Sequence, residues 1–264
     1  MHAQITESNA IATSMVGLAA PITYAVKEQT VHVWRVSLDP PAHQCEQYLR
    51  VLSPDEHKRA AYFATTELRN RWVVGRGVLR MVLGRYLGCD PTELMFNYGV
   101  YGKPRLGGTR GQCGWQFNVA HSYTRALIAV AYDRAVGVDI EYVRPIANID
   151  HVIKDVCSVN EQAWLQTLSP QERSREFFEC WTRKEAIVKA AGRGLIDTPN
   201  QIDVISTNEH VQSIMISDGM GDAAVWDVRA LAPGPGYVGM IAAQGQDWHP
   251  VYREWCDAAA STPA

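Results

Sequence analysis

Two acidic residues at alternate positions of one short segment have the types and the spacing for metal chemistry. Residues 136–141 read VGVDIE, so apolar residues alternate with Gly137, Asp139 and Glu141. On a β-strand this alternation places Asp139 and Glu141 on one face, about 7 Å apart. Two carboxylates this close favour a cation between them, and Mg²⁺ accepts such oxygen ligands together with substrate phosphates and water. An exposed strand face with two solvated acids fits the motif equally well.

A second segment, residues 177–195, has the pattern of an amphipathic helix that ends at Gly192 and Gly194. Glu185 and Lys189 are one turn apart on this helix, and an isolated exposed pair of this kind contributes little. Here Glu185 can supply a third carboxylate beside the strand, and Lys189 can meet a phosphate. The predicted buried stripe of the helix comprises Phe177, Trp181, Val188 and Ala191.

The composition limits the class of protein. The chain has 264 residues, is 47% hydrophobic and carries a net charge of −3, which is enough apolar content for a core and argues against a general nucleic-acid binder. Residues 50–85 are nevertheless rich in arginine and lysine. Such a basic surface suits a phosphate-bearing ligand, and a solvated helix face explains it equally well.

Cysteine usage and hydropathy indicate a cytoplasmic protein. The six cysteines form no Cys-x-x-Cys pair, which argues against a zinc site and against a disulfide framework. No apolar run reaches the roughly 18 residues of a membrane helix, and the start of the chain lacks the charged leader of a signal peptide. We therefore expect neither a membrane nor a nucleic acid as partner.

The predicted elements divide the chain into an extension, residues 1–30, and two halves, residues 31–134 and 135–264. Each half has helices and a strand meander, so the fold class is α+β. The first half is predicted to contain a strand at 31–36, helices at 54–64 and 68–87, and hairpin strands at 117–120 and 126–132. The second half is predicted to contain a strand at 135–142, helices at 159–168 and 177–195, and strands at 201–206, 211–216, 223–230 and 237–243. Aligning Trp72 with Trp181 hints at a duplicated unit and sets Arg76 opposite Glu185 and Arg80 opposite Lys189.

Four short motifs together carry a family resemblance. GVDIE at 137–141 is followed about forty residues later by WTRKEA at 181–186 and Lys189, and this pair resembles the signature of the Sfp-type 4'-phosphopantetheinyl transferase superfamily. FNVAHS at 117–122 resembles the family's F-N-x-S-H-S element, and Gly102-Lys103-Pro104 resembles its G-K-P loop. The resemblance covers roughly residues 50–245.

The resemblance implies a pseudo-twofold α+β fold that binds coenzyme A and Mg²⁺ between its halves. Such enzymes transfer phosphopantetheine from coenzyme A to a serine of an acyl or peptidyl carrier protein and release adenosine 3',5'-bisphosphate. Because one chain can build the whole site, we expect a monomer. By motif, the resemblance implies that Asp139, Glu141 and Glu185 bind the metal, and that Glu185 acts as the base while Lys189 contacts a phosphate. It implies that Lys103 and Pro104 contact the adenine. The implied contacts of the 3'-phosphate are His121 and Arg59, with Arg71 and Arg76 as further candidates.

The sequence also departs from the family pattern. Ala120 stands where the family commonly has serine, so a hydroxyl contact to coenzyme A is missing, and Glu56 stands where some members have a basic residue. Glu161 is a second candidate base, although a glutamate in a capping box is usually structural. The alternative to the transferase is a catalytically weak protein that binds coenzyme A or a nucleotide; a Mg²⁺-dependent nucleotide hydrolase is a third interpretation, and no P-loop supports it. The carrier protein, whether of fatty-acid, polyketide or nonribosomal-peptide synthesis, is left open.

Overall fold

The computed structural model describes residues 29–192, 199–204, 212–217 and 223–256. Nearly all of the predicted extension, residues 1–28, lies outside the described residues, as do the last residues of the chain. Helices and strands are mixed throughout, so the predicted α+β class is confirmed. In the described part of the chain, no helix is both long enough and apolar enough to cross a membrane.

The first half of the chain forms a sheet with three helices on one face. Its strand order is β10-β1-β5-β4, and a separate small hairpin joins β2 to β3. The capping box predicted at Ser53 is present and starts the second helix. The elements are β1 (Thr30–Ser37), α1 (Ala42–Arg50), α2 (Pro54–Ala61), α3 (Thr66–Leu87), β2 (Phe96–Tyr98), β3 (Pro104–Leu106), β4 (Trp115–Ser122) and β5 (Arg125–Tyr132), with short 3-10 turns at Pro91–Glu93 and Gly108–Arg110.

The second half repeats this plan with a sheet of order β6-β9-β8-β7. Capping boxes at Ser158 and Ser169 start two of its helices, and Gly192 in the left-handed conformation ends the second of them. The elements are β6 (Val136–Tyr142), α4 (Ile149–Val156), α5 (Val159–Gln166), α6 (Pro170–Ala191), a 3-10 turn (Pro199–Gln201), β7 (Gln212–Ser217), β8 (Ala223–Leu231), β9 (Tyr237–Gln244) and β10 (His249–Glu254).

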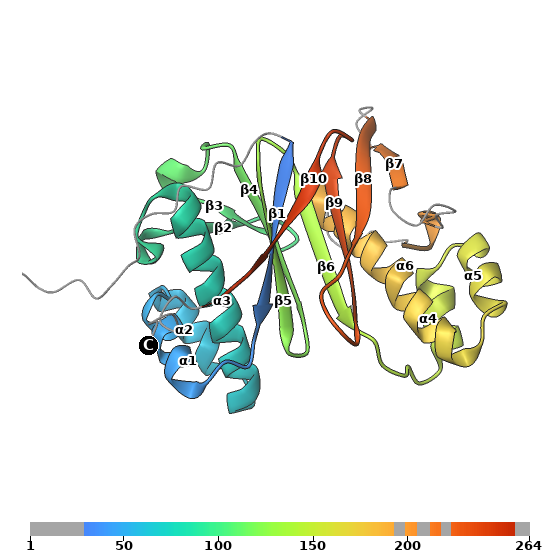
Figure 1. The fold of residues 1–264 in the computed structure, drawn as a ribbon, viewed down its shortest axis with the longest axis horizontal. Helices are drawn as coiled ribbons and strands as arrows, with labels where there is room; N and C mark the ends of the chain where they lie inside the picture. The colour runs from blue at the N-terminus through green and yellow to red at the C-terminus, as the bar shows by residue number, and fades with distance from the viewer. Residues whose placement is uncertain (1–28, 193–198, 205–211, 218–222, 257–264) are drawn as a thin grey trace, which may run out of the picture.

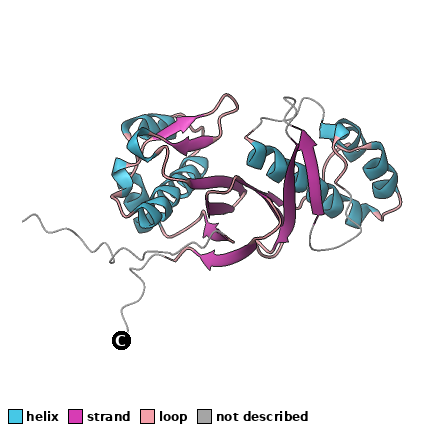
Figure 2. Cartoon of the chain, turned by 90° about the horizontal axis from the view of Figure 1, so that it is seen from above, coloured by secondary structure: helices cyan, strands magenta, loops and turns pink. Residues whose placement is uncertain are grey.

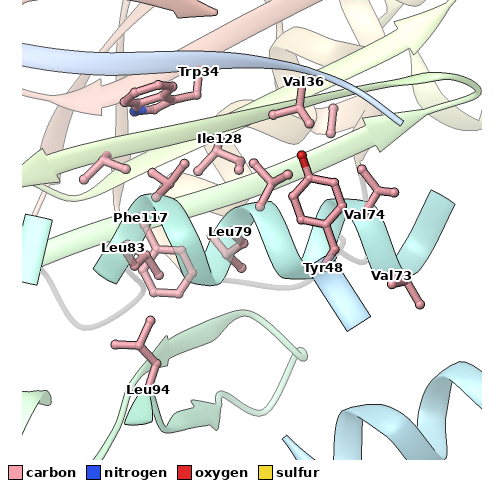
Figure 3. Close-up of a cluster of buried hydrophobic side chains, with 14 of the residues drawn as sticks. Trp34, Val36, Tyr48, Val73, Val74, Leu79, Leu83, Leu94, Phe117 and Ile128 are labelled. Carbon is pink, nitrogen blue, oxygen red and sulfur yellow. The ribbon is translucent and has the colours of Figure 1, made fainter. Parts of the chain in front are cut away.

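The two sheets lie side by side in the middle of the molecule, and the helices cover the outside on either flank (Figures 1 and 2). One core cluster fills the space between α3 and the first sheet, where Leu79 and Leu83 meet Ile128 (Figure 3). A second cluster joins the sheets, with Val33 and Leu127 from the first and Val138 and Ile241 from the second. The fold therefore places β6 between the first sheet and helix α6.

Several elements differ from the prediction. Helices α1 and α4 and strand β10 were not predicted, and α6 begins earlier than expected, at Pro170. The strand predicted at 201–206 is wrong for its described residues, because Gln201 ends a 3-10 turn and no strand follows it before residue 205. Strand β10 pairs in parallel with β1, so the end of the chain completes the sheet of the first half.

Helices α3 and α6 have matching lengths and ends. Each has 22 residues, and each stops at a glycine in the left-handed conformation, Gly88 or Gly192. Strand β1 pairs with β5, which pairs with β4, just as β6 pairs with β9, which pairs with β8. Aligned by their ends, the two helices place Arg80 opposite Lys184, which differs from the register suggested by aligning Trp72 with Trp181.

Candidate active site

A glycine lets helix α6 lie directly on strand β6. A Cβ atom on Gly137 would come within 2.2 Å of the Ala186 carbonyl oxygen and the Ala190 nitrogen, so no larger residue fits without moving the helix. The alternation predicted for β6 is present, because Val138 and Ile140 enter the core between the sheets. Asp139 and Glu141 consequently share the face of Gly137, toward α6.

Asp139 and Lys189 form an ion pair at this contact. The Lys189 ammonium lies 2.6 Å from Asp139 Oδ1, whereas the buried Oδ2 has no hydrogen-bond partner among the described residues. Asp139 is only 5% exposed, and its burial raises its pKa to about 7 even though the charge of Lys189 opposes this. A buried carboxylate with one unpaired oxygen is costly, and a cation would satisfy it.

Two more carboxylates surround this pair. Burial raises the pKa of Glu185, Lys189 opposes that rise, and the charge of Glu141 adds to it. Glu185 and Glu141 both raise the pKa of Asp139 as well. Among the described residues, no group of three acidic, histidine or cysteine side chains is close enough together to hold a metal ion as it stands. The donor set is all oxygen and mutually repelling, which fits a hard cation such as Mg²⁺.

Strand β4 lies beside β6, and two of its side chains form hydrogen bonds with β6. Asn118 Oδ1 accepts a hydrogen bond from the Val138 nitrogen at 2.8 Å. Ser122 Oγ accepts one from the Tyr142 nitrogen at 3.0 Å and donates one to Glu141 Oε2 at 2.8 Å. We did not predict a role for either residue, although both belong to the FNVAHS element.

The neighbouring His121 is the predicted ligand of the 3'-phosphate region. It lies near the end of β4, where its side chain is exposed to solvent. Although the residue is exposed overall, the ring is close enough to the protein that burial lowers its pKa, and the charge of Lys189 lowers it further. Ala120, in contrast, is 5% exposed and packs in the core between the sheets.

Lys103 reaches across from the first half to the second. Its ammonium donates hydrogen bonds to the carbonyl oxygens of Val136, at 3.0 Å, and Lys189, at 2.5 Å. Burial lowers its pKa to about 8, with a contribution from Arg105. Pro104, the other predicted adenine contact, begins β3. Lys103 also lines a hollow of about 360 Å³ with residues of both halves, among them Arg105, Arg134, Ala190 and Trp226.

The three arginines predicted to contact phosphate have different surroundings. Arg59 is exposed on α2, 5.9 Å from the ring of Trp72. Arg71 pairs with Asp39 at 2.7 Å and with Glu67 at 2.6 Å, and it also lies over the ring of Tyr123.

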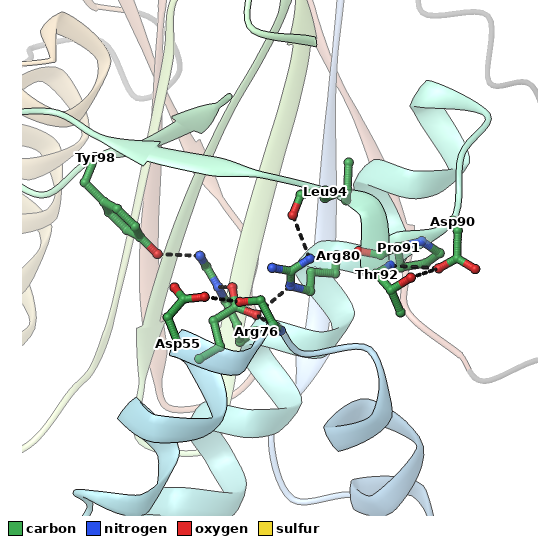
Figure 4. Close-up of polar contacts among 10 residues, drawn as sticks. Asp55, Arg76, Arg80, Asp90, Pro91, Thr92, Leu94 and Tyr98 are labelled. Carbon is green, nitrogen blue, oxygen red and sulfur yellow. Dashed lines mark hydrogen bonds and ion pairs between the residues drawn. The ribbon is translucent and has the colours of Figure 1, made fainter. Parts of the chain in front are cut away.

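Arg76 belongs to a polar cluster inside the first half. It donates to Glu56 Oε1 and to the Tyr98 hydroxyl, both at 2.5 Å (Figure 4). Arg80, which is 1% exposed, donates to Glu56 Oε2 at 2.6 Å. Burial alone would raise the pKa of Glu56, but the two arginines hold it below its usual value. Glu56 stands where some family members have a basic residue, and here its charge is balanced by Arg76 and Arg80.

Comparisons with known proteins match both halves. Residues 36–132 match the family model described as 4'-phosphopantetheinyl transferase, N-terminal, and residues 135–236 match that of the 4'-phosphopantetheinyl transferase superfamily. The 4'-phosphopantetheinyl transferase HetI of Nostoc sp. (strain PCC 7120) is 34% identical over 235 residues, which are 89% of this chain and 96% of the relative. The chain belongs to the 4'-phosphopantetheinyl transferase superfamily.

Other members of the superfamily match shorter stretches. The 4'-phosphopantetheinyl transferase Sfp of Bacillus subtilis (strain 168) is 27% identical over 165 residues, which are 62% of this chain and 71% of the relative. The 4'-phosphopantetheinyl transferase AcpT of Escherichia coli (strain K12) is 34% identical over 124 residues, 47% of this chain and 58% of the relative. The family predicted from the motifs is confirmed.

One residue of the family signature has a structural role in this phosphopantetheinyl transferase. Lys184, within WTRKEA, is 2% exposed and lies 2.6 Å from Glu161 Oε2. Glu161 is fully buried and also accepts hydrogen bonds from the Ser158 and Val204 nitrogens. This full set of partners leaves Glu161 no oxygen for a reacting group, which favours Glu185 among the two candidate bases.

Proposed function

We propose that this chain transfers the 4'-phosphopantetheine group of coenzyme A to a serine of an acyl or peptidyl carrier protein in a Mg²⁺-dependent reaction. The observation that carries the proposal is the buried Asp139 carboxylate, with one unpaired oxygen, beside Glu185, Glu141 and Lys189. These residues belong to the motifs that match the family. We further propose that the chain acts as a monomer in the cytoplasm.

In this reaction the serine oxygen bonds to the phosphorus that carries pantetheine, and the bond from that phosphorus to the bridging oxygen breaks. Adenosine 3',5'-bisphosphate leaves with the electron pair, and Glu185 accepts the serine proton. Glu185 would act directly or through a water, as a general base positioned beside the reacting hydroxyl. A serine hydroxyl needs such help because it is a poor nucleophile at this pH.

Asp139, Glu141 and Glu185 would hold Mg²⁺, which when bound supplies positive charge to the pyrophosphate. Lys189 pairs with Asp139 through its ammonium. The same ammonium would contact the phosphate of the leaving group and stabilise its developing charge.

Coenzyme A recognition is proposed for the predicted basic and loop residues. Arg59 and His121 are exposed and suit contact with the 3'-phosphate. Arg71 and Arg76 are already paired with carboxylates, so each would have to share or exchange that partner to contact the phosphate. Lys103 lines the hollow between the halves, and Pro104 follows it at the start of β3, which supports placement of the adenine there.

Intact-protein mass spectrometry tests the proposal. The chain is mixed with coenzyme A, Mg²⁺ and a panel of apo carrier proteins from fatty-acid, polyketide and nonribosomal-peptide synthesis. A phosphopantetheine adduct on the carrier serine, abolished by a chelator and by Asp139→Asn, is the expected result. Coenzyme A binding without an adduct on any carrier would favour the alternative, a binding protein of the same fold.

A further inference from the structure

Ser122 makes a junction between the two sheets at the predicted metal site. Strands β4 and β6 belong to different sheets, and the described main chain of β4 pairs with β5 rather than with β6. The hydroxyl of Ser122 bridges this gap, since it contacts both the main chain of Tyr142 and the carboxylate of Glu141. One side chain of the first half therefore touches a predicted metal ligand of the second.

The direction of the two hydrogen bonds is fixed by chemistry. The Tyr142 nitrogen can only donate, so the Ser122 oxygen accepts at 3.0 Å. The single hydroxyl proton is then directed to Glu141 Oε2 at 2.8 Å. Arg144 lies 3.5 Å from the same oxygen. Both contacts engage Oε2, which leaves Oε1 for a cation within the described part of the chain.

The surrounding structure holds Ser122 in this position. The turn that follows it places Tyr123 at a φ of 52°, a conformation that a non-glycine residue adopts only when its surroundings stabilise it. The Tyr123 ring stacks on Tyr142 with centroids 5.1 Å apart, and the Arg71 guanidinium lies over the Tyr123 ring at 4.9 Å. The hydroxyl thus has a defined place relative to β6.

We propose that Ser122 is a positioning residue that orients Glu141 for metal binding. The inference rests on the proposed function, because it assumes that Glu141 is a metal ligand. A hydrogen bond to a ligating carboxylate fixes its rotamer, and loss of such an outer contact typically weakens metal binding by about 10–100-fold. Ser122 itself touches neither the metal nor the substrate.

The proposal is tested by measuring how tightly the full chain binds Mn²⁺ in the presence of coenzyme A. Binding is monitored as the loss of the electron paramagnetic resonance signal of the free ion. Ser122→Ala should weaken Mn²⁺ binding by about 10-fold or more, and Ser122→Thr should restore most of it. Ser169→Ala is the matched control, since it removes a hydroxyl that caps α6 and contacts Glu172 outside the site. If Ser122→Ala loses its cooperative melting transition, Ser122→Thr and Ser122→Val are compared instead. These two side chains have nearly the same shape, but only threonine keeps the hydroxyl, so a lower Mn²⁺ affinity of Ser122→Val would support the proposal.

A double-mutant cycle with Glu141→Ala identifies the path of the effect. If Ser122 acts through Glu141, Ser122→Ala changes Mn²⁺ affinity little in the Glu141→Ala background. Equal affinity of wild type and the folded hydroxyl-deleted variants would overturn the inference and leave the transferase proposal standing. Absence of Mn²⁺ binding by the wild type would overturn the metal site and this inference together.

Discussion

Both halves of the molecule bury a glutamate at the start of a helix and pair it with a cation from the next, longer helix. In the first half the Ser53 nitrogen donates to Glu56, which pairs with Arg80. In the second half the Ser158 nitrogen donates to Glu161, which pairs with Lys184. The two ion pairs have the same length, 2.6 Å, and stand at corresponding positions of α3 and α6.

The halves differ in how many cations contact the buried glutamate and in which carbonyl oxygens the cation contacts. Arg80 is joined by Arg76 on the same carboxylate, and its Nη1 donates to the carbonyls of Pro91 and Leu94. Among the described residues Lys184 is the single cation on Glu161, and it also donates to the carbonyls of Val156 and Pro199. The first half can therefore lose one cation and keep another, which the second half cannot.

A larger difference lies on the strand that faces each long helix. In the first half the residues of β1 that face α3, Trp34 and Val36, are part of an apolar core. In the second half β6 presents Asp139 and Glu141 to α6. A buried ion pair is therefore present in both halves, whereas the acids on β6, with Asp139 Oδ2 left unpaired among the described residues, are specific to the second half. This difference supports the proposed placement of the metal site in the second half.

The largest expected effect is on activity. Asp139→Ala should reduce carrier modification by at least about 100–1,000-fold, the loss typical when a preorganised charged group leaves an active site. The fold should persist, because the wild-type carboxylate is itself costly to bury. Carrier modification by mass spectrometry and far-ultraviolet circular dichroism measure the two outcomes. A folded variant with undiminished activity would remove Asp139 from the site.

The two buried pairs are compared by removing each cation. Lys184→Met leaves Glu161 buried without a counter-ion and should lower the free energy of unfolding by about 3–5 kcal/mol. Arg80→Met should cost less, because Arg76 still holds Glu56. Urea denaturation of both variants gives the order. A larger loss for Arg80→Met would contradict the view that Arg76 provides a reserve.

The halves should also respond to pH with opposite signs. The lowered pKa of Glu56 means that its stabilisation is present above the unfolded value near 4.5 and is lost as the pH falls through the folded value. The pKa of Asp139, raised from 3.8 to about 7, means that without metal the stability falls as the pH rises between these values.

Urea midpoints measured with a chelator from pH 4 to pH 8 test these two slopes separately. Asp139→Asn should flatten the decline toward neutral pH, and Mg²⁺ should oppose that decline in the wild type, because it binds the ionised carboxylate. Glu56→Gln should leave this decline in place and reduce the dependence at the acidic end. A decline that survives in Asp139→Asn would assign it to other groups, Glu185 first.

The smallest effect concerns coenzyme A recognition by the first half. Arg59→Ala should raise the KM for coenzyme A by about 10-fold, the equivalent of one hydrogen bond between charged groups. Dephospho-coenzyme A, which lacks the 3'-phosphate, should be affected much less. Steady-state kinetics with both substrates measures the difference. Equal losses would argue against a 3'-phosphate contact by Arg59.

Local signals in the sequence predicted much of this architecture. The capping boxes at Ser53, Ser158 and Ser169 and the glycine after α6 involve contacts within a few residues, so the sequence pattern alone identifies them. The alternation of β6 likewise predicted its acidic face. Helices α1 and α4 were missed, because α1 lacks a side-chain cap and α4 begins at Asn148 without one.

The long-range contacts were beyond local patterns. The pairing of Lys184 with Glu161, and of Lys103 with carbonyls of the other half, joins residues far apart in the chain. Lys184 stood inside the family signature, but nothing nearby in sequence indicated that it is buried. The contact of Ser122 with Glu141 similarly depends on how the two sheets meet.

Strand β10 has a consequence for how the molecule is made. It comes last along the chain yet lies in parallel beside β1, the first described strand. During synthesis β1 therefore cannot pair with β10 along this edge until the second half has left the ribosome. A fragment that stops after β5 would keep this edge open, and open strand edges recruit other chains. The first sheet therefore depends on a strand from the second half for its complete edge.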